Sequence, residues 1–372
     1  MEKVKLKDIC RLINGRAYKQ EELLDSGKYP VLRVGNFFSD KVFYYSDLEL
    51  EEDKYCDNGD LLFAWSASFG PKIWDGEKVI YHYHIWKMEL TDRVNKEFLF
   101  YYLFHLSERI KSEGHGGIMI HTTKAEMEER EFNLPTLEEQ IAISEILNKV
   151  MSVIDKRKEE LSVLDDLIKA RFVEMFGSIH ESTGYPYLAL KDLSDVISGG
   201  TPSRGKAEFW NNGTIPWVKT TELKNNVITD VDEYITEEGL VNSSAKLVPA
   251  GTILVAMYGQ GKTRGMTAYL DIEASTNQAC ACILPSDKID SMFMWKYFEL
   301  SYDKLRSLAQ GAGQPNLNGN MIKNFKVLVP PIEMQKSYVN FVNQVDKSKV
   351  KVQKALDETQ KLFDSLMQQY FG

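Results

Sequence analysis

The chain has 372 residues, long enough for two or three domains, and its 43% apolar and 27% charged residues are ordinary for a soluble globular protein. Its formal net charge of −9 argues against a protein that simply coats nucleic acid. No run of about 18 apolar residues occurs, and the N-terminal MEKVKLKDIC lacks the apolar core of a signal peptide, so we expect a cytoplasmic location. The four cysteines form neither a disulfide framework nor a ligand set with zinc spacing, which predicts buried thiols and no metal site.

Residues 1–133 predict a mixed α/β domain. Its expected elements are a short helix that ends at a glycine (6–15), a strand after a proline (29–33), a turn followed by a buried strand (59–64) and a glycine-rich loop (114–117). His82 and His84 stand two apart, as on one strand face, but no cysteine or carboxylate constellation joins them. We therefore predict no metal site there.

Residues 134–177 predict one long helix. Thr136 is a good N-cap, Glu139 completes a capping box with it, and Gly177 suits the position after the helix end. Apolar residues recur four and three apart, which is the heptad seam of a coiled coil. The seam is formed by Ile143, Leu147, Val150, Ile154, Leu161, Leu164, Ile168 and Met175, and skips Arg157 and Arg171.

The rest of the chain repeats this plan, with a second domain at 178–328 and a second long helix at 329–372. The matching segments of the second domain are 190–199, 215–219, 251–256 and 311–314. The second seam, from Tyr338 to Tyr370, is again mostly apolar, with Lys349 and Thr359 as polar members. The chain therefore reads as a tandem duplication.

Each long helix can bury its apolar stripe against the other. The pattern predicts an α/β protein with two tandem mixed domains separated by two helices that form an antiparallel coiled coil with pseudo-two-fold symmetry. Roughly 35 helical residues make a rod of about 50 Å. Such a rod spaces two domains by more than one DNA turn of about 34 Å, which suits a reader of two half-sites with an unread gap.

Several motifs together resemble the specificity subunit of type I restriction-modification systems. They are the Pro-x-x-Glu-x-Gln entries of both long helices, their Phe-Gly endings, Asn-Gly-Asp-Leu-Leu-Phe-Ala (58–64), Ala-Ser-Thr-Asn-Gln-Ala-Cys (274–280) and Gly-Gln-Pro-Asn-Leu-Asn (313–318). The resemblance covers essentially the whole chain. The first copy departs from the pattern, since Tyr83-His84-Ile85-Trp86 stands in place of Thr-Asn-Gln-Ala.

This resemblance implies two target-recognition domains that read a split duplex DNA sequence, and a coiled coil that docks two modification subunits and, through them, restriction subunits. It also implies that the chain holds no cofactor, because S-adenosylmethionine, ATP and magnesium belong to the partner subunits. The sequence agrees in lacking both the glycine-rich cofactor loop and the Asn/Asp-Pro-Pro-aromatic motif of a methyltransferase. We therefore predict no catalytic residue.

Polar and basic side chains in glycine-rich or turn segments are the candidate DNA contacts, because arginine and lysine pair with guanine or phosphate and amides pair with adenine. In the first domain they are Arg16, Arg33, Ser66, Ser68 and Lys72. In the second domain they are Arg204, Lys206, Gln260, Lys262, Thr263, Arg264, Gln314, Asn316 and Asn318. Each of them has the alternative of a solvated surface residue or a turn former.

Two other functions remain open from the sequence alone. The acidic total fits a coiled-coil scaffold whose two domains bind other proteins. Residues 256–263 come close to a phosphate-binding loop, but Ala256 stands where its first glycine belongs.

Overall fold

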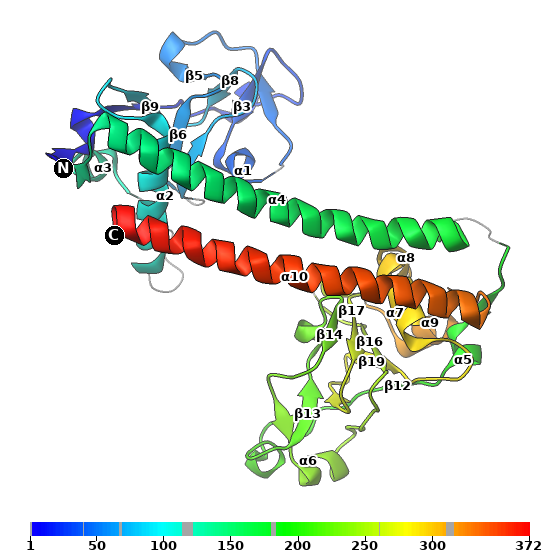
Figure 1. Cartoon of the computed structure of the whole chain (residues 1–372). Helices are drawn as coiled ribbons and strands as arrows, with labels where there is room; N and C mark the ends of the chain where they lie inside the picture. The colour runs from blue at the N-terminus through cyan, green and yellow to red at the C-terminus, as the bar shows by residue number, and fades with distance from the viewer. Residues whose placement is uncertain are drawn as a thin grey trace. The chain divides into compact units, whose positions relative to one another are not determined.

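A computed structural model describes residues 2–39, 41–66, 69–113, 122–179, 184–259, 261–309 and 316–372. The chain divides into two compact units, one of residues 1–158 with 354–372 and the other of residues 159–353. Each unit contains one globular head and a section of both long helices (Figure 1). We call residues 2–134 the first head and residues 187–328 the second head.

The first head contains two four-stranded sheets and a strand pair at its base. One sheet has the order β2-β9-β6-β7, the other the order β4-β3-β8-β5, and β1 pairs with β10. The strands are β1 (Glu2–Lys5), β2 (Cys10–Asn14), β3 (Tyr29–Leu32), β4 (Tyr44–Ser46), β5 (Tyr55–Cys56), β6 (Leu61–Ala64), β7 (Gly70–Ile73), β8 (Val79–Tyr81), β9 (Ile85–Leu90) and β10 (Glu131–Leu134). The helices are η1 (Leu6–Asp8), η2 (Gln20–Glu22), α1 (Val34–Phe37), η3 (Glu52–Lys54), α2 (Lys96–Glu113) and α3 (Lys124–Glu128).

The second head has a five-stranded sheet of order β12-β19-β16-β17-β14, a three-stranded sheet of order β15-β13-β18 and the pair β11-β20. Its strands are β11 (Tyr187–Ala189), β12 (Val196–Ser198), β13 (Ile215–Val218), β14 (Asn226–Ile228), β15 (Tyr234–Ile235), β16 (Ile253–Ala256), β17 (Thr267–Leu270), β18 (Ser275–Thr276), β19 (Cys280–Ile283) and β20 (Lys326–Leu328). Its helices are α5 (Leu190–Leu193), η4 (Ala207–Phe209), η5 (Thr220–Glu222), α6 (Glu237–Val241), α7 (Ser291–Leu300), α8 (Tyr302–Ser307) and α9 (Gly319–Asn324).

The two heads share one strand plan, which confirms the predicted duplication. In the first head β9 lies between β2 and β6, and β3 runs parallel to β8. In the second head β19 lies between β12 and β16, and β13 runs parallel to β18. Helix α2 covers β7 as α7 covers β17.

One predicted element is wrong in both heads. The segments that end at Gly15 and Gly199 were expected to be helical, but the short helices η1 and α5 stop early and strands β2 and β12 follow. In β2 the burial alternates at Cys10, Arg11 and Leu12, with only the arginine exposed, which is the two-residue period of a strand.

Each head begins and ends in one strand pair at the entry to a long helix. Glu2 lies opposite Leu134 in the first head, and Tyr187 lies opposite Leu328 in the second. Helix α4 (Leu137–Phe176) starts just after β10, and α10 (Ile332–Phe371) starts just after β20. At the start of α4, Thr136 and Glu139 exchange the capping-box hydrogen bonds that their spacing predicts.

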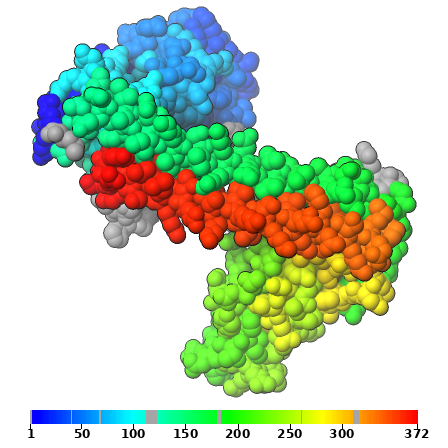
Figure 2. Space-filling view, in the orientation of Figure 1, coloured from blue at the N-terminus to red at the C-terminus, as the bar shows by residue number. Residues whose placement is uncertain are grey.

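The long helices run antiparallel in both units. In the first unit Leu147 and Ile154 of α4 are buried with Phe363 and Met367 of α10. In the second unit Tyr338 of α10 donates to the Ile168 carbonyl of α4 (3.3 Å). Lys349, later in α10, pairs with Asp165, earlier in α4 (2.5 Å), as antiparallel helices require. Much of the outward surface of α4 and α10 is open in the space-filling view (Figure 2).

The polar seam positions have partners within the described parts of the chain. Arg157 donates to the Ala355 carbonyl and to the Thr359 hydroxyl, and the Arg171 guanidinium lies 5.6 Å from the Phe341 ring centroid. These contacts compensate the two guanidinium groups for the water that they lose at the helix interface.

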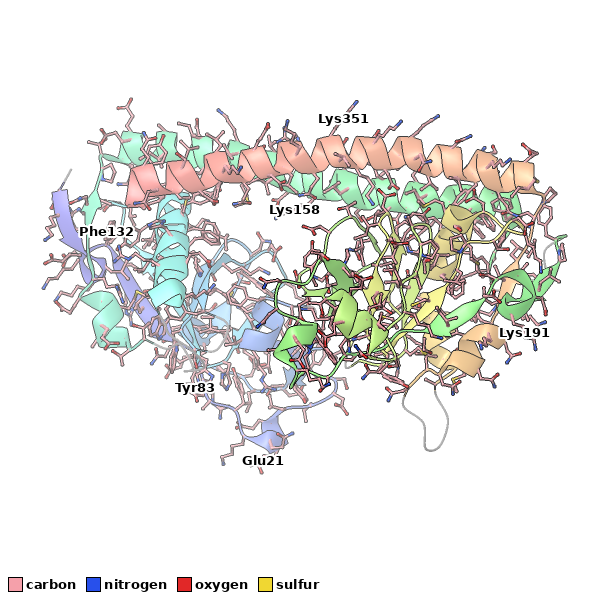
Figure 3. All side chains as sticks on the ribbon, turned by 90° about the horizontal axis from the view of Figure 1, so that it is seen from below. Glu21, Tyr83, Phe132, Lys158, Lys191 and Lys351 are labelled. Carbon is pink, nitrogen blue, oxygen red and sulfur yellow. The ribbon has the colours of Figure 1, made fainter. Side chains whose placement is uncertain are left out.

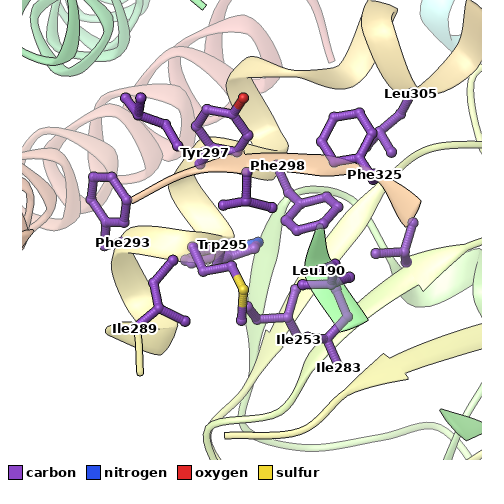
Figure 4. Close-up of a cluster of buried hydrophobic side chains, with 14 of the residues drawn as sticks. Leu190, Ile253, Ile283, Ile289, Phe293, Trp295, Tyr297, Phe298, Leu305 and Phe325 are labelled. Atoms are coloured by element: carbon purple, nitrogen blue, oxygen red, sulfur yellow. The ribbon is translucent and has the colours of Figure 1, made fainter. Parts of the chain in front are cut away.

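Aromatic packing joins the second head to its section of the long helices. Phe172 and Tyr338 from the helices are buried with Phe293 and Tyr297 of α7. Figure 4 shows how the α7 side chains spread into the head, where Trp295 and Phe298 lie near Ile253 and Leu190. A helix that is buried on nearly every side needs such apolar residues all round.

Candidate nucleic-acid interface

A frame of main-chain hydrogen bonds fixes one end of the strands in the first head. Gly15 N–H donates to the Ile85 carbonyl (3.2 Å), and Arg16 N–H donates to the Tyr81 carbonyl (3.0 Å). His82 N–H donates to the Leu32 carbonyl (2.9 Å). In addition, Trp65 N–H donates to the His84 carbonyl (3.0 Å), so the segments after β2, β3, β6 and β8 meet here.

The second head has the same frame. Gly199 N–H donates to Cys280 (3.3 Å), and Gly200 N–H donates to Thr276 (2.8 Å). The remaining two bonds run from Asn277 N–H to Val218 (3.0 Å) and from Met257 N–H to Ala279 (2.8 Å). The bonds match one for one, so they define equivalent residues without reference to the side chains.

These equivalences correct one expected alignment. Thr276-Asn277-Gln278-Ala279 corresponds to Tyr81-His82-Tyr83-His84, and the placement opposite residues 83–86 was two positions out. The parallel pairing settles the register, because Leu32 lies opposite Tyr81 as Val218 lies opposite Thr276.

The frame requires glycine at Gly15 and Gly199. A Cβ at Gly15 would overlap the carbonyl oxygens of Tyr81 and His82, and one at Gly199 would overlap those of Thr276 and Asn277. Main chain approaches main chain too closely there for a side chain to fit.

In the second head, a loop between β16 and β17 carries the basic candidates. The Arg306 guanidinium donates to the Arg264 carbonyl (2.8 Å), and the Tyr302 hydroxyl donates to the Lys262 carbonyl (2.7 Å). Leu317 N–H donates to the Met257 carbonyl (3.0 Å). Gly265 N–H donates to the Ala256 carbonyl (2.9 Å), next to Met257 of the frame, so residues 261–265 and 316–318 both adjoin the frame.

The predicted residues of these two segments differ in their freedom to bind. The Lys262 and Asn316 side chains are exposed, while Thr263 and Arg264 are half-buried. The Asn318 side chain accepts from Met321 N–H (3.0 Å) and caps α9, which is a structural role. Gln260 and Gln314 lie outside the described residues.

Arg204 and Lys206 both lie against aromatic rings. The Arg204 guanidinium is 3.7 Å from the Trp210 ring centroid and 4.9 Å from that of Trp217, and it pairs with Glu233 (2.5 Å). Lys206 Nζ lies 4.7 Å from the Phe209 ring centroid. The Arg204 guanidinium would have to leave these partners to contact a base.

The second head also presents residues that were not among the predicted contacts. Gln278 is exposed beside the frame and shares a hydrogen bond with the Thr201 hydroxyl, and Tyr258 is exposed at the start of the loop. Gln278 belongs to the motif at 274–280, so position within that motif was the available signal.

The first-domain candidates are scattered by comparison. Arg16 makes two hydrogen bonds to Glu22 (2.9 and 2.7 Å), which lower the pKa of that carboxyl to about 2. Lys72 Nζ lies 5.3 Å from the Trp74 ring centroid and 3.4 Å from an Asp75 oxygen. Ser66 is buried, and Ser68 lies outside the described residues.

Arg33 has a different setting. It lines an open cavity of about 850 Å³, and its guanidinium is 5.3 Å from the Tyr44 ring centroid. His82 and His84 line the same cavity, with ring centroids 4.9 Å apart. They lie between β8 and β9 rather than along one strand.

Aromatic and imidazole rings surround this part of the frame. Trp65 Nε1 donates to the Tyr83 carbonyl (2.8 Å), and its ring centroid lies 4.9 Å from that of His84. Tyr83 is exposed on the side of the head away from the long helices (Figure 3). Burial, followed by His84 and Arg33, lowers the pKa of His82 to about 4, so the imidazole is neutral at pH 7.

Four observations bear on alternative functions. A phosphate-binding loop opens a helix, whereas residues 257–266 lead into strand β17, so the loop resembles that motif in composition only. Over the described ranges, no group of three or more His, Cys, Asp or Glu side chains is placed to hold a metal ion. Within the same ranges, no helix is both long and apolar enough to span a bilayer. All four cysteines are free and buried, as predicted.

The chain matches the type I restriction modification DNA specificity domain over residues 1–164 and again over 184–359. It is 25% identical over 374 residues to the MjaVIII specificity subunit of Methanocaldococcus jannaschii, which spans 93% of this chain and 86% of the relative. It is 28% identical over 160 residues to the EcoR124I/EcoR124II specificity subunit of Escherichia coli, spanning 42% of this chain and 40% of the relative.

A solved type I specificity subunit from M. genitalium has the same fold. The TM-score is 0.57 at 16% identity, over 98% of this chain and 94% of that one. Because the family model covers both heads and most of both long helices, the chain belongs to the specificity subunits of type I restriction-modification systems, the non-catalytic component that carries their DNA specificity domains.

Proposed function

We propose that each head reads one half of a split duplex DNA sequence through the side chains that surround its frame. The observation that carries this proposal is the matched frame itself. Identical main-chain bonds in both heads hold unrelated side chains, which are His82, Tyr83 and Trp65 in one head and Asn277, Gln278 and Met257 in the other. A constant scaffold with variable side chains is what two readers of different sequences need.

The residues that we propose as DNA contacts are the candidates named from the sequence for the first and the second head. Exposed Lys262 and Asn316, with Thr263 and Arg264 in the same two segments, border the second frame, and Gln278 joins them. Gln260 and Gln314, outside the described residues, are proposed from the sequence alone. Arg33 borders the first frame. Arg16, Ser66, Ser68, Lys72, Arg204, Lys206 and Asn318 remain proposals with less support, because the described ones among them have protein partners or are buried.

The net charge of −9 bears on the need for partners. A protein with this charge gains little from released counterions, so most phosphate contacts must come from elsewhere. We propose that two modification subunits supply them, with S-adenosylmethionine bound there and ATP and magnesium bound by restriction subunits in a cytoplasmic complex. The chain itself would hold no cofactor.

The test is a random-duplex selection on the chain co-expressed with a modification subunit. The expected product is a motif of two short defined halves with a fixed unread gap. Replacing residues 178–328 by the corresponding segment of a relative should change one half only. Retained DNA without any enriched motif would contradict the proposal and favour a protein-binding scaffold.

A further inference from the structure

The cavity of the first head lies at the frame and is lined by polar groups of both signs. Its walls come from Asp25 before β3, from the segment after β3, from residues 41–44 and from the turn between β8 and β9. Arg33, Lys41 and Asp25 are the charged residues of its lining, and His82 and His84 are the imidazoles. Its volume of about 850 Å³ is in the range of ligand sites.

None of these three charges has an ion pair in the described part of the chain, the Lys41 ammonium included. Within the described ranges, neither the Arg33 guanidinium nor the Asp25 carboxylate has an ion pair or a side-chain hydrogen bond. The equivalent of Arg33 in the second head is Lys219, which follows Val218 as Arg33 follows Leu32. Lys219 pairs with Glu233 (3.0 Å) and Asp232 (3.5 Å), so the same position is neutralised there.

The Arg33 guanidinium is also held in place. It lies 5.3 Å from the Tyr44 ring centroid, and Arg33 N–H bonds to the Asn36 side chain at the start of α1. Stacking on an aromatic ring restrains the planar guanidinium, so less entropy is lost when it binds a planar partner.

The pair of charges discriminates between possible ligands. A phosphate would gain from Arg33 and Lys41 but would leave the Asp25 carboxylate, which lines the same cavity, without a hydrogen-bond donor. A G·C base pair suits both, because arginine donates two hydrogen bonds to guanine O6 and N7 and a carboxylate accepts from the cytosine amino group. A wrong base would leave one of the charges desolvated and unpaired, which makes the preference strong.

We infer that Arg33 and Asp25 are specificity-determining residues of the first head and that they recognise a G·C base pair in its half of the target. This inference rests on the proposed DNA-reading function. It predicts at least one G·C base pair in the first half-site, whereas the proposed function alone predicts no particular base.

The test compares selections on four versions of the full chain, each co-expressed with a modification subunit. They are the unaltered chain, Arg33→Lys, Asp25→Asn and the control Arg11→Ala. Arg11 is an exposed arginine of the first head, paired with Glu89 and not part of the cavity lining. The exchange of residues 178–328 identifies which half of the motif belongs to the first head.

The unaltered chain should prefer guanine at one position of the first half, and both cavity variants should lose about tenfold to a hundredfold of that preference. Lysine keeps the charge but not the two-pronged geometry, so Arg33→Lys separates base reading from phosphate contact. Arg11→Ala should leave the motif unchanged. Unaltered thermal unfolding of the variants shows that they are folded.

Three outcomes would overturn the inference. They are a first half without a G·C position, an unchanged preference in both variants, and an equal loss of affinity for all sequences. If the unaltered chain enriches no motif, the DNA-reading function itself fails and this inference fails with it.

Discussion

The two heads share one main-chain frame but differ in whether the charged side chains beside it are paired. In the second head Arg204 and Lys219 are neutralised by Glu233 and Asp232. In the first head Arg33 and Asp25 line a cavity, and among the described residues neither has an ion-pair partner. Because the frame consists of main-chain bonds, its side chains can change from a charge network to an open polar cavity without altering the strands.

The junction with the long helices offers the largest expected effect. Phe172→Ala removes a fully buried ring that packs against Phe176, Phe293 and Tyr338, and should lower the free energy of unfolding by about 3–5 kcal/mol. Val163→Ala on the same helix is the control, since this side chain is 58% exposed and should cost less than about 0.5 kcal/mol. Denaturant unfolding followed by hydrogen exchange would measure both, and protection lost only in the first unit would contradict the assignment.

The frame itself should be equally sensitive in both heads. Gly15→Ala and Gly199→Ala each force a Cβ against carbonyl oxygens, and we expect a loss of about 1–3 kcal/mol in either case. Gly205→Ala, whose added Cβ would meet only the Ser203 hydroxyl at 3.9 Å, is the matched control. If Gly199→Ala lowered the stability and Gly15→Ala did not, the frame would matter in one head only. Thermal unfolding is sufficient to decide.

Substitutions of Arg204 and Arg33 should have different effects, the first on stability and the second on DNA recognition. Arg204→Ala loses an ion pair and its stacking on Trp210 and Trp217, which should cost about 1–2 kcal/mol. Arg33→Ala should change the free energy of unfolding by less than about 0.5 kcal/mol while weakening DNA selection. Equal stability losses in the two variants would erase the contrast between the heads.

A fourth expected effect is a pH response of the first head. The pKa of His82 is about 4 in the folded chain and about 6.5 in an unfolded one, so only the unfolded state takes up this proton between those values. Stability should therefore fall as the pH drops from 7 towards 5, and His82→Asn, which copies Asn277, should reduce that fall. The comparison needs melting temperatures of both proteins at pH 7 and pH 5. Identical slopes would show that another group is responsible.

The long helices were predictable because their signal is local and repeated. The seam from Ile143 onward and the Thr136 capping box are patterns that only one structure satisfies well. Short segments carry less information. For this reason the sequence of Cys10–Asn14 predicts a helix, although tertiary pairing with β9 makes it a strand.

The candidate interface was only partly predictable. Residue type and glycine content singled out Lys262 and Asn316, which lie beside the frame, but nothing in the sequence shows that Arg204 lies against two tryptophans or that Asn318 caps a helix. The equivalence of His82 and Asn277 depends on main-chain hydrogen bonds, and side-chain similarity pointed two residues away. The sequence around His82 and His84 excludes a metal site but does not show that both imidazoles line a cavity with Arg33.

The strand pairs β1–β10 and β11–β20 have a consequence for how such chains can be rebuilt. The chain enters and leaves each head at neighbouring points, so a head is a cassette bounded by two junctions that lie side by side. A recombination event with breakpoints in these strands exchanges one whole recognition element and leaves α4 and α10 untouched. A short linker between the same two ends would permit circular permutation of the isolated head.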